Sequence, residues 1–139
     1  MPYESKLLGS TIIVAWDRPD LADVRNVVSE VAHARRRVGQ PLLYVAYIPD
    51  ATATPEAPVR EAMSRSMPEL LESCESIVFI LEGSGFKVSI GRAALAGIML
   101  ASGHRGRVHV TGSIGQAAAK VPPEVLTHLR TLRAKRDGE

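Results

Sequence analysis

With 139 residues, of which 45% are hydrophobic and 23% charged, the chain has the size and composition of a single globular domain with one core. Its net charge of +2 is too small to indicate nucleic-acid binding, and its single cysteine excludes an internal disulfide and a zinc cluster of thiolates. No apolar run approaches the roughly 18–20 residues that cross a bilayer, and the first residues lack the basic and apolar regions of a secretory signal. We therefore expect a cytoplasmic domain of bacterial type.

The N-terminal third of the sequence predicts a strand hairpin, a helix and a central strand. Residues 3–8 and 11–16 read as strands, and Gly9-Ser10 has the composition of a two-residue turn. Asp17 or Asp20 can cap the helix that follows, and Gly39 can end it. The long apolar run at 41–48 predicts a buried strand near the middle of a sheet.

The helix at 21–37 is expected to be amphipathic. Its expected apolar face consists of Leu21, Val24, Val28, Val31 and Val38, and its opposite face carries Arg25, Asn26, Ser29, Glu30 and His33. The arginines at 35–37 suit the negative end of the helix dipole, although a patch for a partner is an alternative.

The second half of the chain continues the alternation of helices and strands. An apolar stripe predicts a helix over 59–74, which Pro68 should divide near Ser66, where Ser-x-x-Glu has capping-box spacing. A buried strand at 76–81 is followed by a small-residue helix at 89–102 and a strand at 107–111. A short helix at 113–120 and a final helix from Pro122 complete the domain, with Val125, Leu126, Leu129 and Leu132 facing inward and a charged, frayed tail at 133–139.

This order of elements predicts one α/β domain over residues 1–139. Apolar strands that alternate with helices favour right-handed crossovers and a mixed, mainly parallel sheet of about five strands, flanked by helices, with an antiparallel edge. The sequence shows no internal repeat and no domain boundary.

The sequence offers no constellation of acid, base and nucleophile, so we predict no catalytic residue, no metal and no cofactor. The four histidines lack metal-ligand spacing, and Cys74 falls on an apolar stripe as a buried thiol would. Gly83-Ser84-Gly85 after a buried strand can hold an anion, but it fits neither the dinucleotide fingerprint nor the P-loop, and a plain turn is the alternative.

The loop at 49–58 is the most suggestive feature, because it leaves a central strand at the edge of the sheet where α/β folds usually place ligands. The residues assigned to partner binding in and after this loop are Asp50, Thr52, Thr54, Arg60 and Met63. The hydroxyls of Thr52 and Thr54 lie near a helix N-terminus, where an added phosphate would be stabilised. The alternative is a solvated connection stiffened by proline.

The element order, carried by 11–16, 21–38, 41–49 and the Met67-Pro68-Glu69-Leu70-Leu71 run leading into 76–83, resembles the STAS domain of anti-sigma-factor antagonists and its SpoIIAA-like relatives. That resemblance covers about residues 11–120 and implies a small cytoplasmic module that works by binding and is commonly switched by phosphorylation after a central strand. The matching place here is Asp50 to Thr54; the family motif is typically Asp followed closely by paired Ser/Thr and Gly, and this chain has Asp50-Ala51-Thr52-Ala53-Thr54-Pro55 without the glycine.

We therefore expect a non-catalytic regulatory module that contacts a protein partner around residues 49–63. The alternative is a carrier of a lipid or small molecule, with Met63, Met67, Phe86 and Met99 lining a pocket under the helix at 59–74. Homodimerisation through the aliphatic helix at 89–102 is a further expectation.

Overall fold

The computed structural model describes residues 3–17, 20–48, 57–82 and 106–137, apart from the side chains of residues 60, 136 and 137. In chain order its elements are β1 (Tyr3–Leu8), β2 (Thr11–Trp16), α1 (Leu21–Val38), β3 (Leu42–Ile48), α2 (Ala57–Ser73), β4 (Cys74–Leu81), β5 (Val108–Thr111), α4 (Ile114–Ala117) and α5 (Pro123–Asp137). The helix expected at 89–102 lies outside the described residues.

The five strands form one sheet in the order β1-β2-β3-β4-β5. β1 pairs antiparallel with β2 across the Gly9-Ser10 turn, where Gly9 has φ 60°, and every other pair is parallel. The expected mixed, mainly parallel sheet is therefore confirmed, with β3 at its centre. The strands follow one another in sequence order, so among the described strands no reversal of order creates a switch-point crevice.

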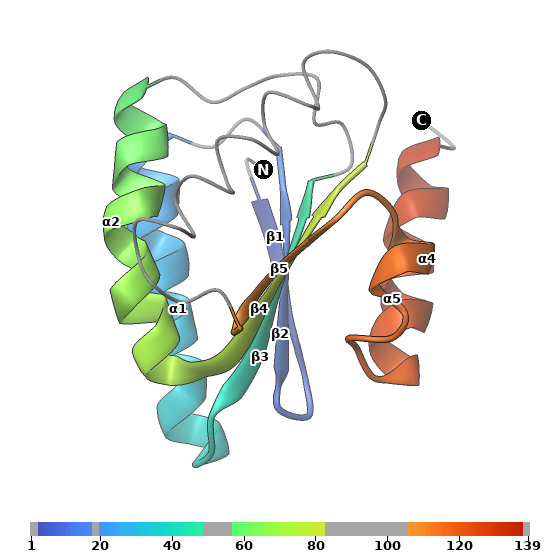
Figure 1. The fold of residues 1–139 in the computed structure, drawn as a ribbon, viewed down its shortest axis with the longest axis horizontal. Helices are drawn as coiled ribbons and strands as arrows, with labels where there is room; N and C mark the ends of the chain where they lie inside the picture. Colours follow the sequence, from blue (N-terminus) through green and yellow to red (C-terminus); the bar gives the residue numbers. More distant parts are fainter. Residues whose placement is uncertain (1–2, 18–19, 49–56, 83–105, 138–139) are drawn as a thin grey trace.

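Of the described helices, α1 and α2 cover one face of the sheet and α4 and α5 the other (Figure 1). The parallel strands β2, β3 and β4 follow one another across the sheet in a single direction. Crossover connections of the same handedness therefore place α1 and α2 on the same face of the sheet. Within the described part of the chain, the opposite face is covered by the segment that follows β5 (Figure 1). The C-terminal helices are therefore part of the core structure.

Among the described residues, two large hydrophobic clusters lie on opposite faces of the sheet, and a small third cluster surrounds Leu81. The first includes Tyr44 and Ala46 and packs under α1 and α2, whereas the second includes Val45 and Tyr47 and packs under α4 and α5. Successive residues of β3 thus enter opposite cores, which explains why its sequence is an unbroken apolar run.

Helix α1 confirms the expected caps and corrects the expected apolar face. Asp20 caps it, forming a reciprocal capping box with Asp23, and Gly39 ends it with φ 78°. The buried residues are Asp23, Val24, Val27, Val31 and Ala34. Leu21, assigned to the apolar face from the sequence, is 39% exposed because it lies in the first turn, beyond the edge of the cluster.

Helix α2 is one helix, and the expected division near Ser66 is wrong. Pro68 lies inside it, and Ser66 is a buried interior residue whose hydroxyl donates to the carbonyl of Ala62 instead of capping a new helix. The helix ends at Ser73, so Cys74 is the first residue of β4 and not part of a helical stripe. The helix continues through the proline because Met67, Leu70 and Leu71, on both sides of it, pack on the same core.

Helix α5 places its inward face as expected. Val125 and Leu129 are fully buried, and Leu126 and Leu132 pack partly buried against the same cluster. The helix continues to Asp137, so the charged segment from Arg133 onwards is helical up to that residue.

Candidate functional site

Most of the residues assigned to partner binding from the sequence fall outside the described structure. Asp50, Thr52 and Thr54 lie in the segment 49–56, and Arg60 belongs to α2 without a described side chain. Met63 is half-buried in the second turn of α2. The structure therefore places α2 but leaves the phosphorylation hypothesis for Thr52 and Thr54 a prediction.

The residues assigned to a carrier pocket divide in the same way. Phe86 and Met99 lie outside the described residues. Met67 is 3% exposed and belongs to the same cluster as Leu70 and Cys74. The described underside of α2 is thus packed against the sheet at this residue.

A polar cluster that sequence inspection missed lies at the carboxyl edge of the sheet, between the sheet and α5. The hydroxyl of Tyr47 donates to Oε1 of Glu82, and Nη1 of Arg133 lies 3.5 Å from Oε2 of the same carboxylate. We call these three residues the edge cluster. Tyr47 comes from the end of β3, Glu82 directly follows β4, and Arg133 lies on α5.

Strand alternation brings the edge cluster together. Val78 and Ile80 face the core under α5, so Glu82, two residues further, faces the same side. Tyr47 faces that side as well, and the backbone N–H of Glu82 donates to the carbonyl of Ile48 at 3.0 Å, which holds the two strand ends together. On α5, Arg133 is four residues from the buried Leu129 and therefore shares its face.

Burial makes the edge cluster energetically significant. Glu82 is only 9% exposed and Tyr47 only 1% exposed. A carboxylate in such a place needs compensating partners: the Tyr47 hydroxyl donates a hydrogen bond to it, and the Arg133 guanidinium supplies an opposite charge 3.5 Å away. The guanidinium is more than half exposed, so its attraction to Glu82 is weakened by solvent. The cluster can fix the strand ends from which the segments starting at residues 49 and 83 continue.

The signal for this cluster was present in the sequence. A glutamate two residues after a pair of buried alternating positions predicts a carboxylate at the rim of the core. Its partners on β3 and α5 could not be assigned without the sheet order and the position of α5.

Cys74 is a buried thiol, as its apolar surroundings indicated. It is 1% exposed, and burial raises its pKa to about 12, with a smaller opposing effect from Arg107. Because the thiolate is the nucleophilic form, this residue is poorly suited to react at neutral pH. Arg107 itself donates to the carbonyls of Leu71 at 2.6 Å, Cys74 and Glu75 at 3.1 Å, and so fixes the junction of α2 and β4.

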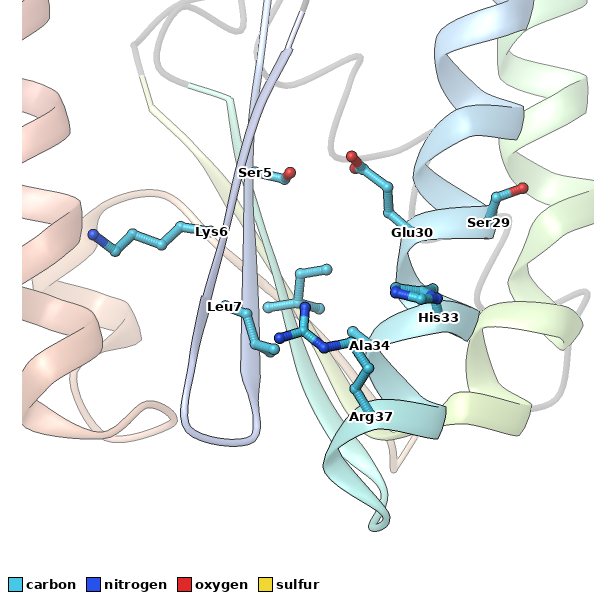
Figure 2. A pocket seen from close by; sticks show the side chains of 9 residues that line it. Ser5, Lys6, Leu7, Ser29, Glu30, His33, Ala34 and Arg37 are labelled. Carbon is cyan, nitrogen blue, oxygen red and sulfur yellow. The ribbon is translucent and has the colours of Figure 1, made fainter.

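A shallow groove of about 350 Å³ lies between β1 and α1 (Figure 2). Its lining includes Ser5, Leu7, Glu30, His33 and Arg37. Figure 2 shows Glu30 pointing from α1 towards Ser5, whereas Lys6 points to the opposite side of the strand. The sequence pattern assigned Glu30 and His33 to the side of α1 opposite its apolar face. In the structure both residues line the groove between this helix and β1, the edge strand of the described sheet.

The described histidines do not gather around a common point. Within the described ranges, no three histidine, cysteine or acidic side chains are placed to hold a metal ion. His109 and His128 are half-buried, and burial together with neighbouring lysines lowers the pKa of each imidazole. None of the helices that the structure describes has the length and hydrophobicity needed to cross a membrane.

Comparison of the chain with protein-family models, with curated proteins and with solved structures gives no match. The resemblance to STAS domains therefore stays a prediction, whereas the α/β architecture rests on the structure itself.

Proposed function

We propose that this chain is a non-catalytic regulatory module that binds a protein partner with the end of the molecule where α1 and α2 begin. This binding surface comprises residue 21 and residues 49–63. The proposal retains the interpretation of the sequence and adds Leu21 to the surface.

The observation that carries the proposal is the exposure of Leu21. Among the described residues it is the large hydrophobic side chain that remains exposed, at 39%. It begins α1, and α1 and α2 lie side by side on one face with both N-termini at the carboxyl edge of the sheet (Figure 1). A partner that covers this side chain would remove its apolar surface from water, which is favourable.

The first turns of α2 combine buried side chains, which pack on the core, with exposed side chains, which a partner can contact. Val59 is buried and holds the helix to the core, whereas Ala57, Pro58 and Glu61 are exposed. Met63, half-buried, lies between these two environments. A flexible, apolar methionine at the boundary of a rigid helix suits a contact surface.

Photo-crosslinking tests this surface directly. A photoreactive side chain at Met63 should crosslink one protein from a lysate of the source cells, and the same group at Glu72, exposed near the other end of α2, should not. The captured protein is then purified and its affinity for the chain measured. Leu21→Ser should weaken binding about tenfold, since the burial of this apolar side chain by the partner is lost.

Glu72→Gln serves as the matched control and should leave the affinity unchanged. Equal crosslinking from both positions, or an affinity insensitive to Leu21→Ser, Met63→Ser, Arg60→Ala and the Thr52→Ala/Thr54→Ala double variant, would contradict the proposal. Native mass spectrometry of the purified chain checks the carrier alternative, which requires a mass above that of the bare polypeptide.

A further inference from the structure

Among the described strands, β1 is an edge strand with an unpaired outer side, and its sequence is self-complementary. β1 is the first strand of the sheet, and no described strand pairs with its outer side. Glu4, Ser5 and Lys6 are all exposed on it. An open edge presents backbone N–H and C=O groups that can pair with another strand.

The orientation of these backbone groups follows from the neighbouring ladders. The N–H of Leu43 on β3 donates to the carbonyl of Ser10, so the even-numbered residues of β2 bond towards β3 and the odd-numbered ones towards β1. Ser5 lies opposite Val14, an even-numbered residue. The backbone groups of Tyr3, Ser5 and Leu7 therefore face outward, and those of Glu4 and Lys6 bond to β2.

The side chains alternate in the complementary way. Glu4 and Lys6 face α5. Nζ of Lys135 on α5 lies 3.9 Å from Oε1 of Glu4, and the charges of Glu4 and Lys6 both influence the pKa of His128 on the same helix. Ser5 and Leu7 face α1 and line the groove described above. Tyr3 packs on Trp16 on that side, with ring centroids 5.7 Å apart.

We propose that β1 pairs antiparallel with β1 of a second copy of this chain, about a two-fold axis at Ser5, and so joins two sheets into one. This register places Glu4 opposite the partner's Lys6 and Lys6 opposite the partner's Glu4. It also places Tyr3 opposite Leu7 on the α1 side. Both charge pairs fall at the positions between backbone hydrogen bonds, where opposed side chains come closest.

The other two-fold registers are disfavoured by charge. Backbone bonding allows an axis only at a residue of β1, and an axis at Glu4 opposes two glutamates, whereas an axis at Lys6 opposes two lysines. Axes at Tyr3 or Leu7 shorten the paired segment. Self-complementarity of this kind is what an isologous interface requires, and it selects a second copy over an unrelated peptide.

This inference does not depend on the proposed function, because β1 is separate from the partner-binding surface at residues 21 and 49–63. It also differs from dimerisation through the helix at 89–102. The paired strands are short, so we expect a weak dimer whose population rises with concentration.

Sedimentation velocity of the full chain from about 5 to about 500 µM tests the inference, because a weak dimer is populated by mass action. Ser5→Pro removes one outward N–H that the β1–β2 ladder does not use, so the fold should persist while the dimer is lost. Lys6→Glu opposes four carboxylates in two like-charged pairs and should raise the dissociation constant at least about tenfold. The double variant Glu4→Lys/Lys6→Glu restores opposite charges and should restore the dimer.

Lys120→Glu is the control, since it makes the same change in net charge at an exposed residue away from β1. Circular dichroism reports whether each variant is folded, and the charge variants decide the question if Ser5→Pro does not fold. A wild-type chain that stays monomeric at every concentration, or a dimer that survives Lys6→Glu and Ser5→Pro in their folded forms, would overturn the inference.

Discussion

The alternation of side chains along β4 places the Glu82 carboxylate at the edge of the hydrophobic core. Glu82 continues the buried series of Val78 and Ile80, and its carboxylate accepts the Tyr47 hydroxyl and faces Arg133. A buried acceptor that loses its donor retains the desolvation cost without the compensating bond. The edge cluster is therefore expected to contribute more to stability through Tyr47 than through the exposed arginine.

Tyr47→Phe should lower the free energy of unfolding by about 1–3 kcal/mol, because it leaves the Glu82 carboxylate short of a donor. In the Tyr47→Phe/Glu82→Leu double variant the loss should be smaller than the sum of the two single losses, since the two groups act on each other. Urea denaturation of the four proteins measures this coupling. Strict additivity would show that the hydroxyl and the carboxylate are energetically independent.

Cys74 makes the stability of the chain depend on pH in the alkaline range. Burial raises its pKa from 9.0 to about 12, and burial also raises the pKa of Tyr44. Above pH 9 the unfolded chain therefore binds fewer protons than the folded chain at these residues, so stability is fully present below pH 9 and falls as pH rises.

The expected loss from Cys74 is at most about 1.4 kcal/mol per pH unit within that window. Urea unfolding at about pH 8 and at about pH 10.5 measures it, with Cys74→Ala as the comparison, since the alanine variant lacks this titration. The variant should be less stable at the lower pH yet lose less stability between the two. Equal losses in both proteins would contradict the assignment.

At the scale of elements, α2 shows that a local rule for proline can be overridden by packing. Pro68 lacks the N–H of a helix interior, yet the helix spans the proline because its apolar residues on both sides lie on the same core. The hydroxyl of Ser66 donates to carbonyls of the preceding turn, where a Ser/Thr hydroxyl commonly accompanies a bend. Sequence spacing alone suggested a cap at this residue.

The junction of α2 and β4 depends on Arg107. Carbonyls at a helix C-terminus lack intrahelical partners, and here the guanidinium donates to three carbonyls around this turn. Arg107→Ala should lower the free energy of unfolding by about 1.5–3 kcal/mol, because these bonds involve a charged donor. The free energy of unfolding of Arg107→Lys should lie between those of the wild type and Arg107→Ala, since an ammonium group lacks the fork geometry of the guanidinium.

Arg65→Ala is the matched control for this prediction. Arg65 forms an exposed pair with Glu61 one turn away on the same helix, with 3.5 Å between its Nη2 and Oε2 of the glutamate. Such a pair contributes only about 0.3–0.5 kcal/mol. If Arg65→Ala and Arg107→Ala shift the denaturant midpoint equally, Arg107 does not stabilise the junction of α2 and β4.

At the scale of the whole molecule, the sheet needs cover on both faces. α1 and α2 cover one face as the strands are added, but the other face is covered from the C-terminal end of the chain (Figure 1). Val125 and Leu129 of α5 are fully buried against it. The C-terminal helix is thus required for the core rather than being an appendage to it.

Leu129→Ala should cost about 2–5 kcal/mol, because it opens a cavity against the centre of the sheet. Leu126→Ala, on the same helix but only half-buried, should cost less. Thermal and urea unfolding of both variants measure the difference. A larger loss at Leu126 than at Leu129 would mean that α5 packs through another face.

Short-range patterns in the sequence were sufficient to predict the fold class, the strands and the caps of α1, but not the course of α2 across Pro68. Strands and caps followed from short-range chemistry: the turn at Gly9, the capping aspartate at position 20 and the apolar run of β3 each depend on neighbouring residues. The tertiary structure decided which distant residues meet, because that depends on sheet order and on helix placement. Packing of the complete chain joined Tyr47, Glu82 and Arg133 into one cluster, set α2 on the core across Pro68, and made β1 an edge strand among the described strands, since only packing brings such separated segments together.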